Sequence, residues 1–153
     1  MIRASILSIG RFGRGPERDL YEHYVRRLNW PCDLVELEDR RGGSDAERNA
    51  RENALLRERL TGSDAVIALD ESGREIDSRA FAALLQDFAD QGRRNVAFLI
   101  GGADGLEAET RARADRIVSF GRLTWPHLLV RALLAEQLYR ASAILSGHPY
   151  HRD

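Results

Sequence analysis

Residues 95–105 read Asn95-Val-Ala-Phe-Leu-Ile-Gly-Gly-Ala-Asp-Gly105 and contain the most continuously apolar run of the chain. A strand of a parallel sheet has this composition when helices cover both of its faces. Two adjacent glycines follow, and they turn the chain toward a helix expected to be about ten residues long. We therefore predict that residues 95–100 form the central strand of a parallel α/β sheet.

The same alternation of strand and helix extends in both directions from this stretch. Further apolar runs predict strands at residues 2–9, 33–38, 65–70 and 116–120. Helices are predicted from Pro16 to Leu28, from the capping box Ser44–Glu47 to about Leu60, from Ser78 to Gln91, and from Pro126 onward. Residues Glu71–Arg74 are expected to follow the strand that ends at Asp70 and to precede the next helix. The prediction is a mostly parallel sheet of five or six strands with helices on both faces.

Length and composition indicate one globular domain that spans residues 1–153. The chain is 43% hydrophobic and 31% charged, which excludes a disordered or fibrous protein. The N-terminus has no signal-peptide pattern, and no window approaches 18 consecutive apolar residues. The single cysteine, Cys32, fits a reducing compartment. We expect a cytoplasmic protein without a membrane segment.

All 23 basic residues are arginine, and 24 acidic residues bring the net charge to −1. Arginine suits phosphate recognition, although a genome that favours arginine codons explains the same count. A net charge of −1 provides no overall positive field for naked nucleic acid. Any RNA contact is therefore expected at a local patch or with a partner of defined shape.

Three glycine-bearing loops are candidate ligand sites. The first, Gly10–Gly15, follows a strand but has the spacing G-x-x-G-x-G instead of the dinucleotide pattern G-x-G-x-x-G. In the second, Gly101 and Gly102 let a ligand approach the backbone at the carboxyl end of the central strand, unless they only form a tight turn. The third, Gly121–Pro126, exposes main-chain groups that suit a flat heteroaromatic ring.

The chain ends in His148-Pro-Tyr-His-Arg-Asp153, which concentrates two imidazoles, a phenol and a guanidinium in a few positions. Chain ends usually fray and lack specialised side chains, so we predict that this tail completes an active site. A disordered end is one alternative. A His-x-x-His metal clip is another, but two imidazoles without a third ligand form an incomplete site, and we predict no metal.

Four motifs together resemble a known family: Leu99-Ile-Gly-Gly-Ala-Asp-Gly-Leu106, Leu123-Thr-Trp-Pro-His127, Ala135-Glu-Gln-Leu-Tyr-Arg-Ala141 and His148-Pro-Tyr-His-Arg152. In this order they are similar to the RlmH type of ribosomal RNA methyltransferase, a small member of the SPOUT superfamily. The resemblance spans the whole chain and implies a parallel sheet whose C-terminal segment threads a trefoil knot. Periodicity and spacing alone show no knot.

The resemblance also implies a cofactor, a substrate and an assembly. It implies that S-adenosylmethionine is the methyl donor, that pseudouridine N3 in 23S rRNA of the assembled ribosome is the acceptor, and that the protein is a homodimer packed through the knot. The expected donor-binding residues are Leu69, Gly101, Gly102, Gly121, Arg122, Leu123, Thr124, Trp125 and Pro126.

Methylation of an imide nitrogen requires alignment with the donor and removal of one proton. His151 fits the base by residue type, with His148 as the alternative. Tyr150 is expected to stack on the uracil ring or bond its carbonyls, and Arg152 or Arg140 to stabilise negative charge or hold phosphate. From spacing alone, Glu136 and Arg140 read as a surface ion pair.

Two other classes of protein stay open at this point. A Rossmann or flavodoxin-like nucleotide enzyme would bind its cofactor at Gly10–Gly15. A non-catalytic ribosome-associated factor would keep the arginines but need neither the paired glycines nor the tail.

Overall fold

The computed structural model describes residues 1–153, and its single sheet has five strands that all run parallel. The spatial order of the strands is β2-β1-β4-β3-β5, so β4 lies at the centre as predicted. Their bounds are β1 Arg3–Ile9, β2 Cys32–Leu37, β3 Ala65–Glu75, β4 Asn95–Ile100 and β5 Arg116–Ser119. The predicted parallel α/β sheet is confirmed, with five strands.

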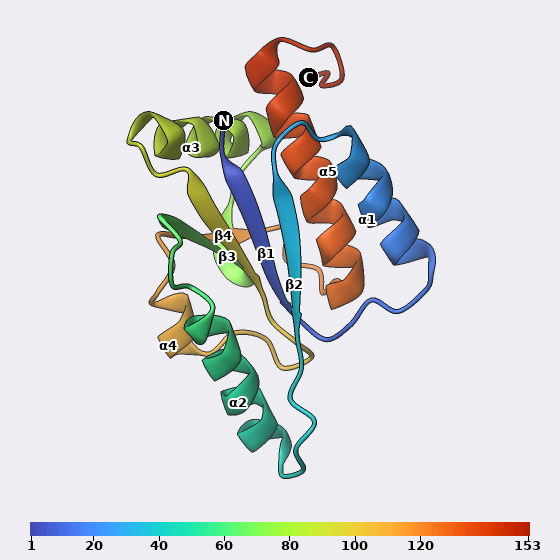
Figure 1. Cartoon of the computed structure of the whole chain (residues 1–153), viewed down its shortest axis with the longest axis vertical. Coiled ribbons are helices and arrows are strands. Elements are labelled where there is room, and N and C mark those ends of the chain that lie inside the picture. The colour runs from blue at the N-terminus through green and yellow to red at the C-terminus, as the bar shows by residue number, and fades with distance from the viewer.

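Helices cover both faces of this sheet. Helices α1, α3 and α5 pack together on one face, while α2 and the short α4 lie on the other (Figure 1). Their bounds are α1 Pro16–Arg27, α2 Asp45–Glu58, α3 Ser78–Asp90, α4 Ala108–Arg111 and α5 His127–Ser146. None of these helices is both long and apolar enough to cross a lipid bilayer.

Two cores, one on each side of the sheet, explain the apolar composition of β4. Phe98 belongs to the larger cluster beneath α1, α3 and α5, whereas Leu99 belongs to the smaller cluster beneath α2. Successive side chains of a strand point to opposite faces, so a strand covered twice needs apolar residues at every position.

Side-chain caps fix where two of the helices begin. The hydroxyl of Ser44 accepts a hydrogen bond of 3.1 Å from the Glu47 N–H, as the predicted capping box requires. The Asp77 carboxylate accepts one of 2.8 Å from the Ala80 N–H at the start of α3.

The sequence prediction was wrong in two places. The helix after Gly105 is four residues long and not ten, because the chain re-enters the sheet soon after it. There Asp115 exchanges backbone and side-chain hydrogen bonds of 2.8 Å with Val66. The strand predicted to end at Asp70 continues through Glu71–Arg74 to Glu75, with a register shift between Leu69 and Arg74.

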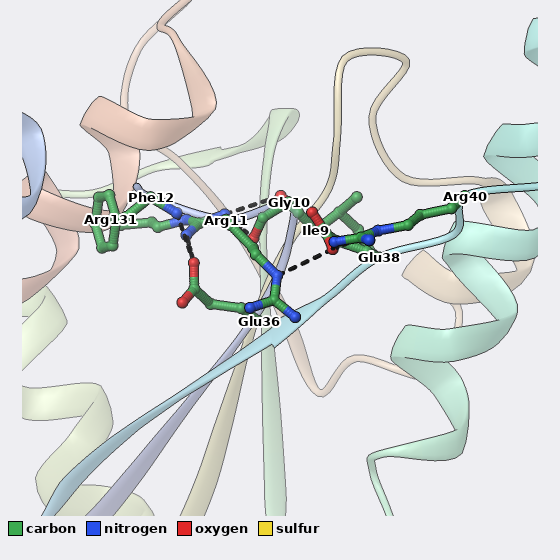
Figure 2. Close-up of polar contacts among 8 residues, drawn as sticks. All are labelled: Ile9, Gly10, Arg11, Phe12, Glu36, Glu38, Arg40 and Arg131. Atoms are coloured by element: carbon green, nitrogen blue, oxygen red, sulfur yellow. Dashed lines mark hydrogen bonds and ion pairs between the residues drawn. The ribbon is translucent and has the colours of Figure 1, made fainter. Parts of the chain in front are cut away.

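Arg131 ties the terminal helix to the first two strands. Its side chain is fully buried and donates hydrogen bonds of 2.9 Å to the carbonyls of Ile9 and Gly10, at the end of β1 (Figure 2). It also pairs at 3.0 Å with Glu36 of β2, whose carboxylate accepts the Phe12 N–H at 2.6 Å. Burial lowers the pKa of Arg131, and the Glu36 carboxylate opposes that shift. The helix is thereby joined to strands about 95 to 122 residues earlier in the chain.

Candidate active site

A cavity of about 520 Å³, which we call the glycine cavity, lies beyond the carboxyl ends of β4 and β5 and against residues Leu69–Ser72 of β3. Seven of the nine residues expected to bind the donor line it: Leu69, Gly101, Gly102, Gly121, Leu123, Thr124 and Trp125. The other two, Arg122 and Pro126, belong to the same loop but are exposed and do not line the cavity. The structure thus brings three separate segments of the chain, one of them within β3, to one site.

In the wall formed by Gly101–Gly105, the first two glycines have little room for a side chain. A Cβ on Gly101 would lie 2.8 Å from the carbonyl carbon of Gly105, and one on Gly102 would lie 3.1 Å from Ile9. The Gly105 N–H donates a hydrogen bond of 3.1 Å to the Gly102 carbonyl, which closes the turn. A ligand in the cavity therefore meets bare backbone at Gly101 and Gly102.

The charged side chains around the glycine cavity are mostly acidic. Asp70, Glu71 and Asp104 line it, opposed by the single guanidinium of Arg111, which donates to the Leu106 carbonyl. His127 also lines the cavity, and burial followed by repulsion from Arg131 lowers its pKa. The imidazole is therefore neutral at neutral pH, and the lining suits a positively charged ligand.

A second cavity of about 680 Å³, the tail cavity, adjoins the first. Phe120, Gly121 and Trp125 line both cavities, so the same loop borders both of them. The Trp125 indole N–H donates a hydrogen bond of 3.3 Å to the Phe120 carbonyl. Among the tail residues, His151 and Asp153 line this second cavity, opposite Phe81, Leu133 and Glu136.

Both ring nitrogens of His151 are engaged. Its Nδ1 lies 3.1 Å from Nη1 of Arg140, and its Nε2 lies 3.1 Å from Oδ1 of Asp153. Since a guanidinium only donates, Nδ1 is the acceptor and Nε2 carries the hydrogen. Asp153 is in turn held by Arg79 through two contacts of 2.7 Å, which lower its pKa to about 2.

Tyr150 is held against the middle of α5. Its hydroxyl donates a hydrogen bond of 2.9 Å to Glu136, and its ring meets the Tyr139 ring edge-on with centroids 4.6 Å apart. Burial raises the pKa of Tyr150, with further contributions from Tyr24 and Glu136. The guanidinium of Arg140 lies 4.8 Å from the centroid of the Tyr150 ring.

These contacts correct two interpretations of the sequence. The tail is folded back on the domain, so the alternative of a disordered end is wrong. Glu136 and Arg140 do not form a simple surface pair, because they lie 2.5 Å apart, keep only 16% and 24% of their side-chain surface exposed, and join the tail network. The i, i+4 spacing predicts that Glu136 pairs with Arg140. Only the folded tail shows that Glu136 also accepts a hydrogen bond from Tyr150.

The remaining tail residues lie further out. The side chain of His148 accepts a hydrogen bond of 3.2 Å from the Tyr150 N–H, and Arg152 is exposed without an ion pair. No three residues of the ligating types His, Cys, Asp and Glu gather closely enough to hold a metal ion.

The Gly10–Gly15 loop lines neither cavity. Two of its backbone groups already form hydrogen bonds within the protein. The Gly10 carbonyl accepts one from Arg131, and the Phe12 N–H donates one to Glu36 (Figure 2). These contacts count against a nucleotide cofactor at this loop.

Comparison with known proteins agrees with this geometry. A family model described as predicted SPOUT methyltransferase matches residues 2–151. The chain belongs to the SPOUT methyltransferase family. A relative from Paramagnetospirillum magneticum, named ribosomal RNA large subunit methyltransferase H, is 53% identical over 99% of both chains.

Solved SPOUT-like structures share the fold at much lower identity. A probable methyltransferase from Bordetella pertussis has a TM-score of 0.60 at 16% identity, covering 92% of this chain and 96% of its own. The SpoU methyltransferase AviRb from Streptomyces viridochromogenes, solved with AdoMet, has a TM-score of 0.51 at 14% identity, covering 94% and 61%. Family membership confirms the resemblance noted in the sequence, and with it the SPOUT fold and its C-terminal knot.

Proposed function

We propose that this SPOUT protein transfers a methyl group from S-adenosylmethionine to N3 of a pseudouridine in 23S rRNA of the assembled ribosome. The observation that carries the proposal is the adjacency of the two cavities, which share Phe120, Gly121 and Trp125. A donor in the glycine cavity and a base in the tail cavity would meet at these residues, as direct methyl transfer requires.

The glycine cavity fits the donor in shape and charge. Bare backbone at Gly101 and Gly102 suits close approach of a heteroaromatic ring, and the carboxylates of Asp70 and Asp104 suit a cation. When bound there, S-adenosylmethionine supplies a methyl group already activated on a sulfonium sulfur. We assign the donor contacts to the cavity residues named above, with Arg122 and Pro126 shaping the loop from outside.

The protein's own task is then to remove the N3 proton and align the nitrogen. We assign proton removal to Nδ1 of His151, because Asp153 accepts from Nε2–H and so fixes the tautomer whose Nδ1 has a lone pair. Arg140 covers that lone pair in the free protein. Arg140 therefore has to turn toward the RNA before His151 can accept a proton, and His148 is the alternative base.

The other tail residues hold the base and its charge. We assign stacking on the uracil ring to Tyr150 and stabilisation of the developing carbonyl charge to Arg140, which Glu136 orients through bonds to Nε and Nη2. Arg152, exposed and unpaired, is assigned to a phosphate of the RNA.

We propose that the protein recognises the shape of the assembled ribosome and that exposed arginines bind phosphates of its RNA. Arg14 and Arg122 follow β1 and β5, are exposed and form no ion pair, so both are free for phosphate. A net charge of −1 gives little attraction for naked RNA, and we therefore propose the assembled ribosome as the substrate and the cytoplasm as the place of the reaction.

We also propose that the active form is a homodimer. Leu123 is 72% exposed and Trp125 is 40% exposed, and both lie at the rim of the glycine cavity. A second copy packed on this loop would cover them and narrow the cavity mouth. Light scattering behind a sizing column should give twice the chain mass.

The decisive experiment is transfer of labelled methyl groups to ribosomes from a strain that lacks the endogenous enzyme. Labelled 23S rRNA in ribosomes, with little label in naked RNA, is expected, together with calorimetric binding of S-adenosylmethionine. A cofactor bound only at Gly10–Gly15 would favour the Rossmann class. Donor binding without any transfer to ribosomes would leave a non-catalytic ribosome factor.

A further inference from the structure

Helix α2 runs along the outside of the segment that forms the glycine wall. Arg48 lies 3.7 Å from Asp104, and Arg57 donates a hydrogen bond of 2.8 Å to the buried hydroxyl of Thr110. One face of α2 therefore follows the segment 102–110, and of these two end contacts only Arg48–Asp104 reaches a residue that lines the cavity.

Asn53 stands in the middle of this face and is 1% exposed. Its amide nitrogen donates to the Gly105 carbonyl at 3.2 Å, and its amide oxygen accepts the Glu107 N–H at 2.9 Å. One buried side chain thus bonds the backbone on both sides of Leu106. The same amide nitrogen bonds Asn49 one turn earlier, which fixes its orientation.

Glu52, the neighbour of Asn53, occupies the space behind Gly102. A Cβ on Gly102 would lie 3.2 Å and 3.3 Å from the two carboxylate oxygens, so this side chain backs the glycine closely. Glu52 is 9% exposed, and burial raises its pKa. Neither Glu52 nor Asn53 lines the cavity, so they reach a ligand only through the turn.

We propose that Asn53 is a positioning residue for the methyl donor, holding the Gly101–Gly105 turn from behind in the shape that the donor binds. The inference rests on the proposed donor site in the glycine cavity. Buried backbone groups need partners, and without Asn53 the Gly105 carbonyl and the Glu107 N–H lose theirs. The turn is then free to relax into the cavity that the donor fills.

The test compares three variants of α2. Asn53→Leu removes both backbone bonds, and Asn53→Asp keeps the acceptor for Glu107 but loses the donor to Gly105. Leu56→Ala is the matched control, because it removes buried volume from the same helix and leaves both Asn53 hydrogen bonds to the turn in place. The loss of Tm relative to the wild type is measured for each variant. Losses of donor affinity are then compared between variants at equal loss of Tm.

Two readouts separate positioning from general stability. Calorimetry should show S-adenosylmethionine binding weakened roughly tenfold in Asn53→Leu and less in Asn53→Asp. Steady-state kinetics of Asn53→Leu should show a higher KM for the donor, while kcat on ribosomes changes little. In the absence of donor, hydrogen exchange of the Glu107 amide should accelerate in Asn53→Leu beyond its rate in Leu56→Ala.

The outcomes are distinguishable. If the wild type does not bind the donor, the proposed function fails and this inference fails with it. If the wild type binds but Asn53→Leu binds equally well, or loses affinity only as Leu56→Ala does at equal loss of Tm, the inference alone is overturned.

Discussion

Arg131 and Glu36 form an ion pair of 3.0 Å in which the guanidinium is fully buried and the carboxylate side chain is 31% exposed. The pair joins the terminal helix to β2, and the two backbone carbonyls at the end of β1 complete the arrangement. A buried pair of this kind adds little net stability compared with apolar residues, but breaking it leaves a charge without its partner. The two residues therefore matter most for where α5 lies.

Glu36→Gln should destabilise the protein by about 3 kcal/mol, because Arg131 stays charged and buried while the amide still serves the Phe12 N–H. Adding Arg131→Met to this variant should recover part of the loss, since the unpaired charge is then gone. Urea unfolding of the two single variants and the double variant measures this coupling.

The matched control is Asp33→Asn on the same strand. Asp33 pairs with Arg3 at 3.4 Å, but both side chains are more than half exposed, so its loss should cost less than about 1 kcal/mol. Equal losses in Glu36→Gln and Asp33→Asn would show that the buried pair does not anchor α5.

Gly101→Ala should weaken donor binding at least roughly tenfold, because a Cβ at this position requires the Gly105 backbone to move. Gly42→Ala is the control, since that position has open space around it and should leave both affinity and Tm nearly unchanged. Calorimetry with S-adenosylmethionine decides the matter. Wild-type affinity in Gly101→Ala would remove the turn from the donor site.

Local patterns in the sequence were enough for the sheet and most of the helices. The apolar run 95–100 and the capping box at Ser44 depend on neighbours within a few residues, and both were found where predicted. Most of the residues expected to bind the donor also lie around one cavity, because parallel strands end at one edge. Here sequence position alone implies proximity.

Contacts between distant residues set the parts that the sequence did not reveal. Gly73 fits in β3 because it has no Cβ. A Cβ at this position would lie only 2.7 Å from the carbonyl carbon of Ile117. The role of Asn53 depends on Gly105, 52 residues away, and that of Glu136 depends on a tail that folds back. The helix and strand periodicities of a sequence do not predict contacts between residues so far apart.

Stability should fall at alkaline pH through Cys32. Burial, together with repulsion from Asp33, raises the pKa of Cys32 to about 11, although a hydrogen bond with Tyr21 partly lowers it. A pKa raised in the folded state gives stability that is complete below the unfolded thiol value of about 8.5 and is lost as the pH rises toward 11.

The unfolding free energy of the wild type should therefore decline between about pH 8.5 and 10, and that of Cys32→Ala should decline less steeply. The slope is the informative quantity, because the substitution itself shifts absolute stability. Burial also raises the pKa of Tyr21, which contributes only at higher pH. Parallel slopes for the two proteins would contradict the burial of this thiol.

Tyr150→Phe should lower methyl transfer to ribosomes about tenfold while donor affinity stays the same. The variant keeps the ring against Tyr139 but removes the hydroxyl that donates to Glu136. Glu136 then loses one of the groups that hold it beside Arg140, and the tail loses one of its contacts with α5. Single-turnover transfer, measured with saturating donor, isolates this effect from binding.

Tyr21→Phe makes the same chemical change away from both cavities and should leave the single-turnover rate unchanged. A chain that ends at Gly147 extends the comparison, since it removes His151 and Asp153 from the tail cavity while sparing the glycine cavity. This truncated protein should bind S-adenosylmethionine normally and transfer no methyl group. Because the donor site is intact in all three variants, full activity in the truncated chain would place the proton acceptor outside the tail and withdraw the role assigned to His151.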